Sequence, residues 1–187
     1  MPSILVVTGS VRPNSVNEKV VPLVTTEVIA QGASAVRADL KEINLPFYDD
    51  QYSPTAPEFE PSNEAVKHWT KLVDDADGVI LVTPEYNHNL SPVQLNAIDW
   101  IGKEWTGKPV GLVGYGWTSG AGQAHAAARE SLAVNLKAKV SDIQTNLFFT
   151  KDLGTDGTVL DEDSVSKKIA ATVSDVLASI QAPVDVA

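Results

Sequence analysis

The chain has 187 residues, of which 43% are hydrophobic and 20% charged, as in ordinary globular proteins. Its 24 acidic and 14 basic residues give a formal net charge of -10 at pH 7, which disfavours binding to nucleic-acid backbones and anionic membrane surfaces. The absence of cysteine excludes disulfides, thiolate nucleophiles and iron–sulfur ligation. The length indicates one domain over residues 1–187, and the amino terminus carries no signal-peptide or membrane pattern, which predicts a soluble cytoplasmic protein.

Short apolar runs alternate along the chain with longer amphipathic stretches. Runs that are apolar at every position are typical of strands buried on both faces of a parallel sheet. The amphipathic stretches carry apolar residues at helical spacing and predict helices. In chain order, the predicted elements are a strand at 4–7, a helix at 15–30, a weaker strand at 33–39, a helix at 63–76, a strand at 79–82, a helix from Pro92 to Ile101, a strand at 110–113, a helix at 122–136, a strand around 143–149 and a helix at 162–180.

This alternating order predicts a doubly wound α/β sandwich around a central parallel sheet of five strands. A stretch rich in proline and acidic residues, 46–61, is predicted to be a long surface loop. Ligands of open parallel sheets bind beyond the carboxyl ends of the strands. The loops at 8–17, 84–89 and 114–123 are therefore the candidate site.

The loop after the first strand is rich in groups that donate hydrogen bonds. These groups belong to Ser10, Arg12, Asn14, Ser15 and Asn17. Because the next helix begins close to Ser15, its unpaired amides and its dipole add to a cradle for a phosphate. The alternative is that Ser15 only caps the helix and Arg12 is a solvated surface residue. Neither the dinucleotide fingerprint nor the P-loop pattern is present.

The loops after the third and fourth strands carry weaker signals. Tyr86 is placed to lie against a planar ring, with the amides of 85–87 at the ring's polar edge. An ordinary exposed loop is the alternative for this segment. The loop at 114–123 contains four glycines, which allow a ligand close to the backbone, although a plain strand-to-helix connection explains it equally.

Two linked motifs resemble the signatures of the NADPH-dependent FMN reductase family. Gly9-Ser10-Val11-Arg12 with Ser15 and Asn17 is similar to its phosphate loop, GSxRxxSxN. Pro84-Glu85-Tyr86-Asn87, followed by Asn96-Ala97-Ile98-Asp99-Trp100, is similar to its second signature, PEYN…NAIDW. The similarity covers residues 4–136. Two positions depart from the family: Leu95 stands where a lysine is frequent, and Gln123 where an arginine is frequent.

The resemblance implies a flavodoxin-like three-layer sandwich that binds FMN without a covalent link. The expected cofactor-binding residues are Ser10, Arg12, Asn14, Ser15, Val16, Asn17, Pro84, Glu85, Tyr86, Asn87, Ser119 and Gly120. The family pattern assigns the phosphate to the first loop, the isoalloxazine ring to 84–87 and the pyrimidine side of the ring to 119–120. It demands no catalytic acid or base. The three histidines, His68, His88 and His125, are too widely spaced to predict a metal site.

The implied activity is transfer of two electrons from NADPH or NADH through FMN to a small acceptor such as a quinone, an azo compound or free flavin. A homodimer or homotetramer is expected. The physiological acceptor, the preferred nicotinamide, the number of subunits and the role of His88 stay open.

Three other functions compete with this interpretation. One is a flavodoxin-type electron carrier that does not itself oxidise a nicotinamide. The presence of Arg12 in the first loop argues against this function. Another is an interaction protein that kept the fold and lost the flavin. The third is a nucleoside deoxyribosyltransferase, for which Glu85 is the well-placed candidate nucleophile.

Overall fold

The computed structural model of the chain describes residues 1–181 and contains a parallel sheet with the strand order β2-β1-β3-β4-β5, in which β6 also pairs with β4. The strands are β1 (Ser3–Thr8), β2 (Ser34–Ala38), β3 (Gly78–Pro84), β4 (Pro109–Gly116), β5 (Lys139–Val140) and β6 (Thr145–Phe148). β5 pairs with the first residues of β4 and β6 with its last four. The two short strands therefore share the fifth position of the sheet.

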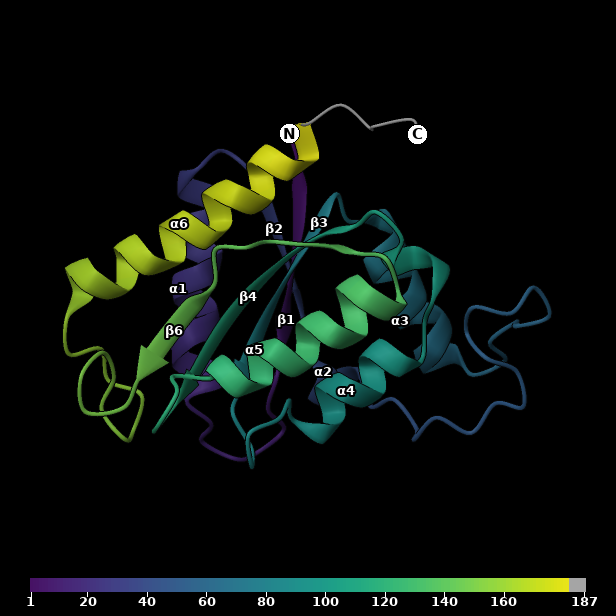
Figure 1. The fold of residues 1–187 in the computed structure, drawn as a ribbon, viewed down its shortest axis with the longest axis horizontal. Coiled ribbons are helices and arrows are strands. Elements are labelled where there is room, and N and C mark those ends of the chain that lie inside the picture. The colour runs from purple at the N-terminus through teal and green to yellow at the C-terminus, as the bar shows by residue number, and fades with distance from the viewer. Residues whose placement is uncertain (182–187) are drawn as a thin grey trace.

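Helices cover both faces of this sheet (Figure 1). They are α1 (Asn17–Ala30), α2 (Leu40–Ile43), α3 (Glu64–Asp75), α4 (Pro92–Asp99), the 3-10 turn η1 (Lys103–Trp105), α5 (Gly122–Arg129), the π-helical turn η2 (Glu130–Asn135) and α6 (Glu162–Gln181). One core joins the sheet to α1 and α6, and a second joins it to α3, α4 and α5. The three-layer flavodoxin-like sandwich predicted from the sequence is confirmed.

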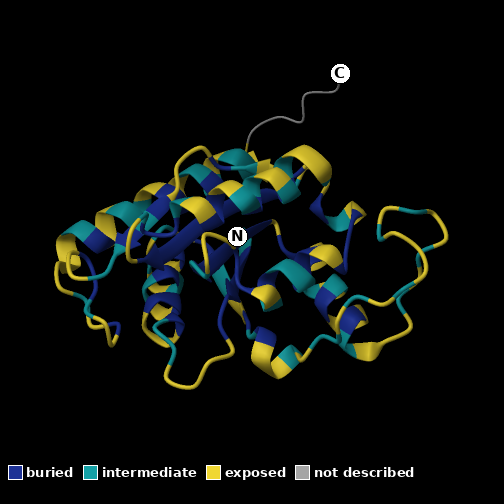
Figure 2. Ribbon diagram, turned by 60° about the horizontal axis from the view of Figure 1, so that its bottom comes forward, coloured by how far each residue is buried: buried dark blue, intermediate teal, exposed yellow. Residues whose placement is uncertain are grey.

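The continuous apolar runs are explained by these two cores. Leu5 and Val7 of β1 pack into the core with α3 and α4, while Ile4 and Val6 pack into the core with α1 and α6. Burying each such side chain stabilises the fold by roughly 1.5–3 kcal/mol. Figure 2 shows the same pattern, with buried strands between helices whose outer faces are exposed. A strand of this kind has no solvent face, so its sequence does not alternate.

The observed elements differ from the predicted ones in a few places. The expected helix at 122–136 is α-helical only to Arg129, and the Leu136 amide then donates to the Ser131 carbonyl, five residues back, at 3.2 Å. The strand predicted around 143–149 is β6, whereas β5, α2 and η1 were not predicted. These three unpredicted elements are short, and local apolar spacing carries little signal for them.

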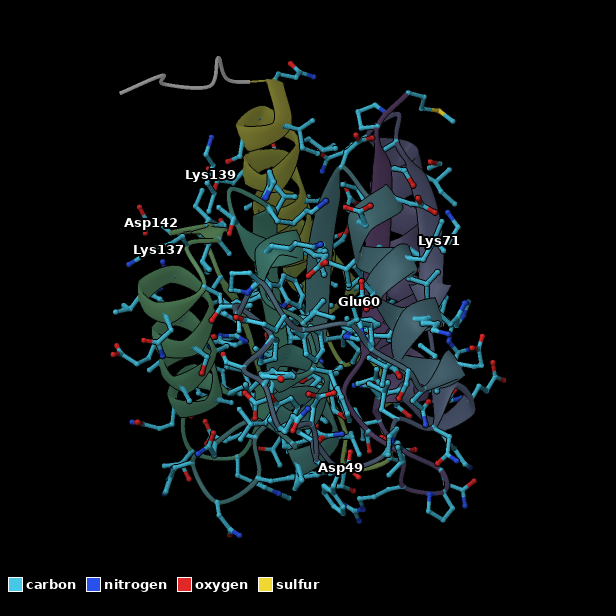
Figure 3. All side chains as sticks on the ribbon, turned by 90° about the vertical axis from the view of Figure 1, so that its right-hand side faces the viewer. Asp49, Glu60, Lys71, Lys137, Lys139 and Asp142 are labelled. Carbon is cyan, nitrogen blue, oxygen red and sulfur yellow. The ribbon has the colours of Figure 1, made fainter. Side chains whose placement is uncertain are left out.

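The loop predicted at 46–61 contains no helix or strand. It extends away from the sheet beside α3 in Figure 1, and Figure 3 labels two of its acidic residues, Asp49 and Glu60. Among residues 1–181, the helices lack the combination of length and apolar character that crossing a bilayer requires. The carboxyl ends of β1, β3, β4 and β6 meet at one edge, where all three predicted site loops begin.

Candidate functional site

Two adjoining clefts open at the carboxyl edge of the sheet. The first has a volume of about 330 Å³ and is lined by Arg12, Pro13, Asn14, Ser15, Val16, Pro84, Glu85, Tyr86, Tyr115, Gly116, Trp117, Phe149 and Thr155. The second has a volume of about 700 Å³ and is lined by Arg12, Glu85, Tyr86, Asn87, Asn89, Leu90, Pro92 and Leu95. Both volumes lie in the range of small-molecule sites. Arg12, Glu85 and Tyr86 form the wall between them.

The loop after β1 presents donors that have no acceptor in the described part of the chain. Within residues 1–181, the Arg12 side chain makes no hydrogen bond or ion pair, and the backbone amides of Asn14, Ser15 and Val16 donate to no protein group. These groups lie just before the first turn of α1, where the helix dipole favours negative charge. Their arrangement suits an anion such as a phosphate.

Ser15 fits both of the interpretations drawn from the sequence. Its hydroxyl accepts a hydrogen bond from the Asn17 amide at 3.2 Å, so it does help to start the helix. That contact leaves the Arg12 side chain and the amides of Asn14 and Val16 without partners in the part of the chain that the structure describes. Capping therefore accounts for the serine hydroxyl and not for the rest of the loop.

Ser10 and Tyr86 connect the first two site loops. The Ser10 hydroxyl lies 3.1 Å from the Tyr86 hydroxyl and accepts a hydrogen bond from the Arg12 amide at 3.3 Å. Ser10 is buried, and Tyr86 is half-buried on the wall that separates the clefts. The pair fixes the distance between the donor-rich loop and the loop after β3.

Asn17 lies below the cleft and not on its surface. Its side chain accepts a hydrogen bond from the Gly9 amide at 3.0 Å and donates to the Val82 carbonyl at 3.1 Å and to the Tyr115 hydroxyl at 3.3 Å. Burial raises the pKa of Tyr115, so this hydroxyl keeps its proton at neutral pH. The Asn17 amide thus joins the ends of β1, β3 and β4.

Glu85 is held by the start of helix α5. Its Oε2 atom accepts hydrogen bonds from the Ser119 hydroxyl at 2.5 Å and from the amides of Gln123 and Ala124 at 3.0 and 3.3 Å. A carboxylate in this place is stabilised by the helix dipole. Because three donors occupy Oε2, Glu85 is poorly suited to act as the nucleophile of a deoxyribosyltransferase.

The loop after β3 closes in a tight turn. The amide of Tyr86 donates to the Asn89 carbonyl, and the amide of Asn89 donates to the Tyr86 carbonyl, each at 3.0 Å. Asn87 and His88 between them have φ angles of 51° and 62°, the left-handed values of a type I′ turn. The turn leaves Asn87 exposed on the wall of the wider cleft.

Packing explains two of the glycines in the loop after β4. A Cβ at Gly114 would lie 2.4 Å from Ala121 Cβ and 2.5 Å from His125 Nε2. A Cβ at Gly120, whose φ is 59°, would lie 2.9 Å from the ring of Phe148. These positions need glycine for contacts within the protein, so the glycine count of this loop is weak evidence for a ligand.

The sequence reasoning missed an aromatic wall on the first cleft. The Trp117 and Phe149 ring centroids are 5.1 Å apart, and Phe149 meets the edge of Tyr115 at 6.0 Å. Trp117 is 62% exposed, which leaves its ring available to a planar ligand. Phe149 follows the last strand, and its place at the same sheet edge was the signal that could have identified it.

His125 is buried behind the Glu85 contact, on the inner side of α5. Neither ring nitrogen has a hydrogen-bond partner among residues 1–181. Burial lowers the pKa of His125 to about 4, despite the opposing effects of the nearby Asn146 amide and the Glu85 carboxylate. The imidazole is therefore neutral at pH 7.

The predicted site residues fall into three groups. Arg12, Asn14, Ser15, Val16, Pro84, Glu85, Tyr86 and Asn87 line the two clefts. Ser10 and Ser119 contact these lining residues through their hydroxyls. Asn17 and Gly120 are buried beside the clefts.

The chain is similar in sequence to known reductases. The chain is 32% identical over 164 residues to the NAD(P)H-dependent FMN reductase ntnL from Nectria sp, a match that covers 83% of this chain and 79% of that protein. It is also 32% identical over 117 residues to a 2-hydroxy-1,4-benzoquinone reductase from Burkholderia sp, covering 59% of this chain and 58% of that one.

A solved structure has the same fold. The flavoenzyme FerB, an NAD(P)H:(acceptor) oxidoreductase from Paracoccus denitrificans, superposes with a TM-score of 0.75 at 23% identity and covers 96% of this chain and 99% of that one. The relatives are reductases, which does not support the electron-carrier alternative. Residues 2–148 match the family model for NADPH-dependent FMN reductases. The chain belongs to this family and is an FMN-dependent NAD(P)H oxidoreductase.

Proposed function

We propose that the loop after β1 binds the FMN phosphate. The observation that carries this proposal is a set of donors without acceptors among residues 1–181, namely the Arg12 guanidinium and the amides of Asn14, Ser15 and Val16. A guanidinium matches a phosphate with parallel hydrogen bonds, and the start of α1 favours its charge. Ser10, Ser15 and Asn17 contribute by fixing the shape of this loop.

The isoalloxazine ring occupies the space between the loops after β3 and β4. Pro84, Tyr86 and Asn87 form one side, and the other side is the segment that contains Trp117, Ser119 and Gly120. Aromatic side chains and exposed amides suit a planar ring with one polar edge. When bound there, FMN supplies hydride and electron transfer between a reduced nicotinamide and an acceptor.

The acceptor is a small planar molecule such as a quinone, an azo compound or free flavin. The wider cleft, about 700 Å³, leaves room beside Asn87 and Leu95 for such a molecule. The benzoquinone reductase from Burkholderia sp supports a quinone in particular. Phe47, which is 81% exposed, and Trp117 support a homodimer or homotetramer, and we propose a cytoplasmic location on the basis of the sequence alone.

Steady-state oxidation of NADH and NADPH tests this function. We expect the FMN-loaded protein to oxidise at least one nicotinamide and to transfer its electrons to benzoquinone, an azo dye or free FMN. The same protein without flavin provides the control. Binding of FMN without oxidation of either nucleotide would contradict the proposal.

A further inference from the structure

The segment between β6 and α6 forms part of the first cleft. Phe149 and Thr155 of this segment line the cleft together with residues 12–16 of the loop after β1. In Figure 1 the segment runs from the tip of β6 to the first turn of α6. The match to the family model ends at residue 148, so this wall of the cleft lies outside the matched region, and no residue of it was expected at the site from the sequence.

Residues 153–159 form a small hairpin with Thr155 at its tip. An antiparallel bridge joins the first and last residues of the hairpin. The Gly157 amide donates to the Gly154 carbonyl at 2.9 Å, which closes a turn that has Thr155 as one of its two central residues. The turn therefore fixes the backbone of Thr155.

The base of the hairpin is anchored in the core through Asp152. The side chain of Asp152 is only 1% exposed, and its two oxygens accept hydrogen bonds from Lys168 Nζ of α6 at 2.5 Å and from the Phe148 amide at 2.9 Å. Hydrogen bonds to a charged group are stronger than those between neutral groups. The hairpin is therefore held in place relative to both β6 and α6.

The tip of the hairpin packs against the start of α1. A Cβ at Gly157, whose φ is 86°, would lie 3.0 Å from Lys19 Cγ and 3.4 Å from Val16 Cα. Val16 carries one of the amides that have no acceptor among residues 1–181. The hairpin thus brings Thr155 to the end of the cleft where these amides lie.

Thr155 adds further donors to this end of the cleft. Within residues 1–181, neither its hydroxyl nor its amide donates to a protein group. The neighbouring Asp156 carboxylate accepts hydrogen bonds from the Thr158 amide and hydroxyl at 3.0 and 2.8 Å, and Asp156 does not line the cleft. The hairpin therefore presents a donor to the cleft while its own negative charge is bound elsewhere.

We propose that the Thr155 hydroxyl donates a hydrogen bond to the FMN phosphate, an inference that rests on the proposed function. A phosphate has several oxygens that accept hydrogen bonds, more than the loop after β1 needs to satisfy alone. The phosphate is then bound by two segments that are far apart in the sequence, residues 12–16 and the hairpin at 153–159.

The variant Thr155→Val tests this contact because it removes the hydroxyl and nearly keeps the shape of the side chain. We expect the affinity of the flavin-free full chain for FMN, measured by flavin fluorescence titration, to fall about 10-fold, since a hydrogen bond to a charged group is lost. The affinity for riboflavin, which has no phosphate, should not change. The phosphorus-31 resonance of bound FMN should shift relative to the wild type.

The matched control is Thr26→Val, which removes the hydroxyl of an exposed threonine on α1 that lines neither cleft. It should bind both flavins as the wild type does and leave the phosphorus resonance in place. Equal weakening of FMN and riboflavin by Thr155→Val would place the hydroxyl at another part of the flavin. That result, an unchanged affinity for FMN or an unchanged phosphorus resonance would each overturn the inference.

The variant Arg12→Gln separates this inference from the proposed function. If Arg12→Gln weakens FMN and not riboflavin, while Thr155→Val binds both flavins as the wild type does, the inference alone is wrong. If Arg12→Gln weakens both flavins equally, the phosphate does not lie beside the loop after β1, and the proposed function fails together with the inference.

Discussion

The loops after β1 and β4 differ in how their polar groups are satisfied. In the loop after β1, Arg12 and three backbone amides have no acceptor among residues 1–181. In the loop after β4, Ser119 and two amides of α5 all donate to Glu85. Donors that face solvent can exchange water for a ligand, whereas donors already bonded inside the protein cannot. The donors of the first loop therefore remain available to a ligand, and those of the second hold Glu85.

Because of this difference, substitutions in the two loops should have different effects, one on FMN binding and the other on the stability of the fold. Changes to the exposed donors of the first loop should weaken FMN binding and leave the fold intact. Changes behind the second loop should weaken the fold. Asn17 is the exception, because it belongs to the first loop and has only internal partners.

The largest expected effect is the loss of stability in Asn17→Leu. The substitution leaves the buried Gly9 amide without its acceptor and the Tyr115 hydroxyl without its donor, whereas Val82 keeps the Gln94 amide as a partner at 3.2 Å. We expect the free energy of unfolding to fall by about 4 kcal/mol, measured by urea titration. Asn14→Gly in the same loop is the control and should leave stability nearly unchanged. Equal stability of Asn17→Leu and the wild type would contradict the internal role of Asn17.

His125 should make stability depend on pH. Burial lowers its pKa from 6.5 to about 4, so between these values the unfolded chain binds a proton that the folded protein excludes. The contribution of neutral His125 to the free energy of unfolding is thus fully present above pH 6.5. It is lost as pH falls, by roughly 3 kcal/mol at pH 4. His125→Gln should show a flatter pH dependence in urea titrations, whereas His68→Gln should follow the wild type. A curve for His125→Gln that parallels the wild type would rule out this contribution.

Arg12→Gln should affect binding and not folding. Loss of the charged hydrogen bonds to phosphate should weaken FMN about 30-fold, or about 2 kcal/mol, as measured by flavin fluorescence titration. Riboflavin lacks the phosphate, so its affinity should not change. If FMN and riboflavin weaken equally, Arg12 does not contact the phosphate.

The smallest expected effect is that of Ser119→Ala. Glu85 loses one of three donors and keeps the amides of Gln123 and Ala124, so unfolding should become easier by about 1 kcal/mol. Since Ser119 lies on the ring side of the site, any loss of affinity should be the same for FMN and riboflavin. A loss confined to FMN would place the phosphate near α5 and contradict the comparison between the loops.

The layers of the fold and the position of the two clefts at the carboxyl edge of the sheet were predictable from the sequence. The apolar runs at 4–7, 79–82 and 110–113 identify the central strands because both of their faces are buried. The rule that ligands bind at the carboxyl edge then points to the loops that line the two clefts. Short elements such as β5 carry too few residues for a periodic signal.

Individual contacts were less predictable, since they depend on distant partners. Asn17 and Asn14 are the same residue type three positions apart, yet one is buried against β3 and β4 and the other is exposed. The role of Glu85 depends on Ser119 and α5, more than 30 residues away. No local pattern distinguishes such a carboxylate from a free one.

The most direct test of the central claim is a visible spectrum of the protein with FMN, recorded before and after anaerobic addition of NADPH and then NADH. We predict a bound flavin band that bleaches with at least one of the two nucleotides. A protein that binds no flavin at excess FMN, or whose flavin bleaches only with dithionite, would contradict the account.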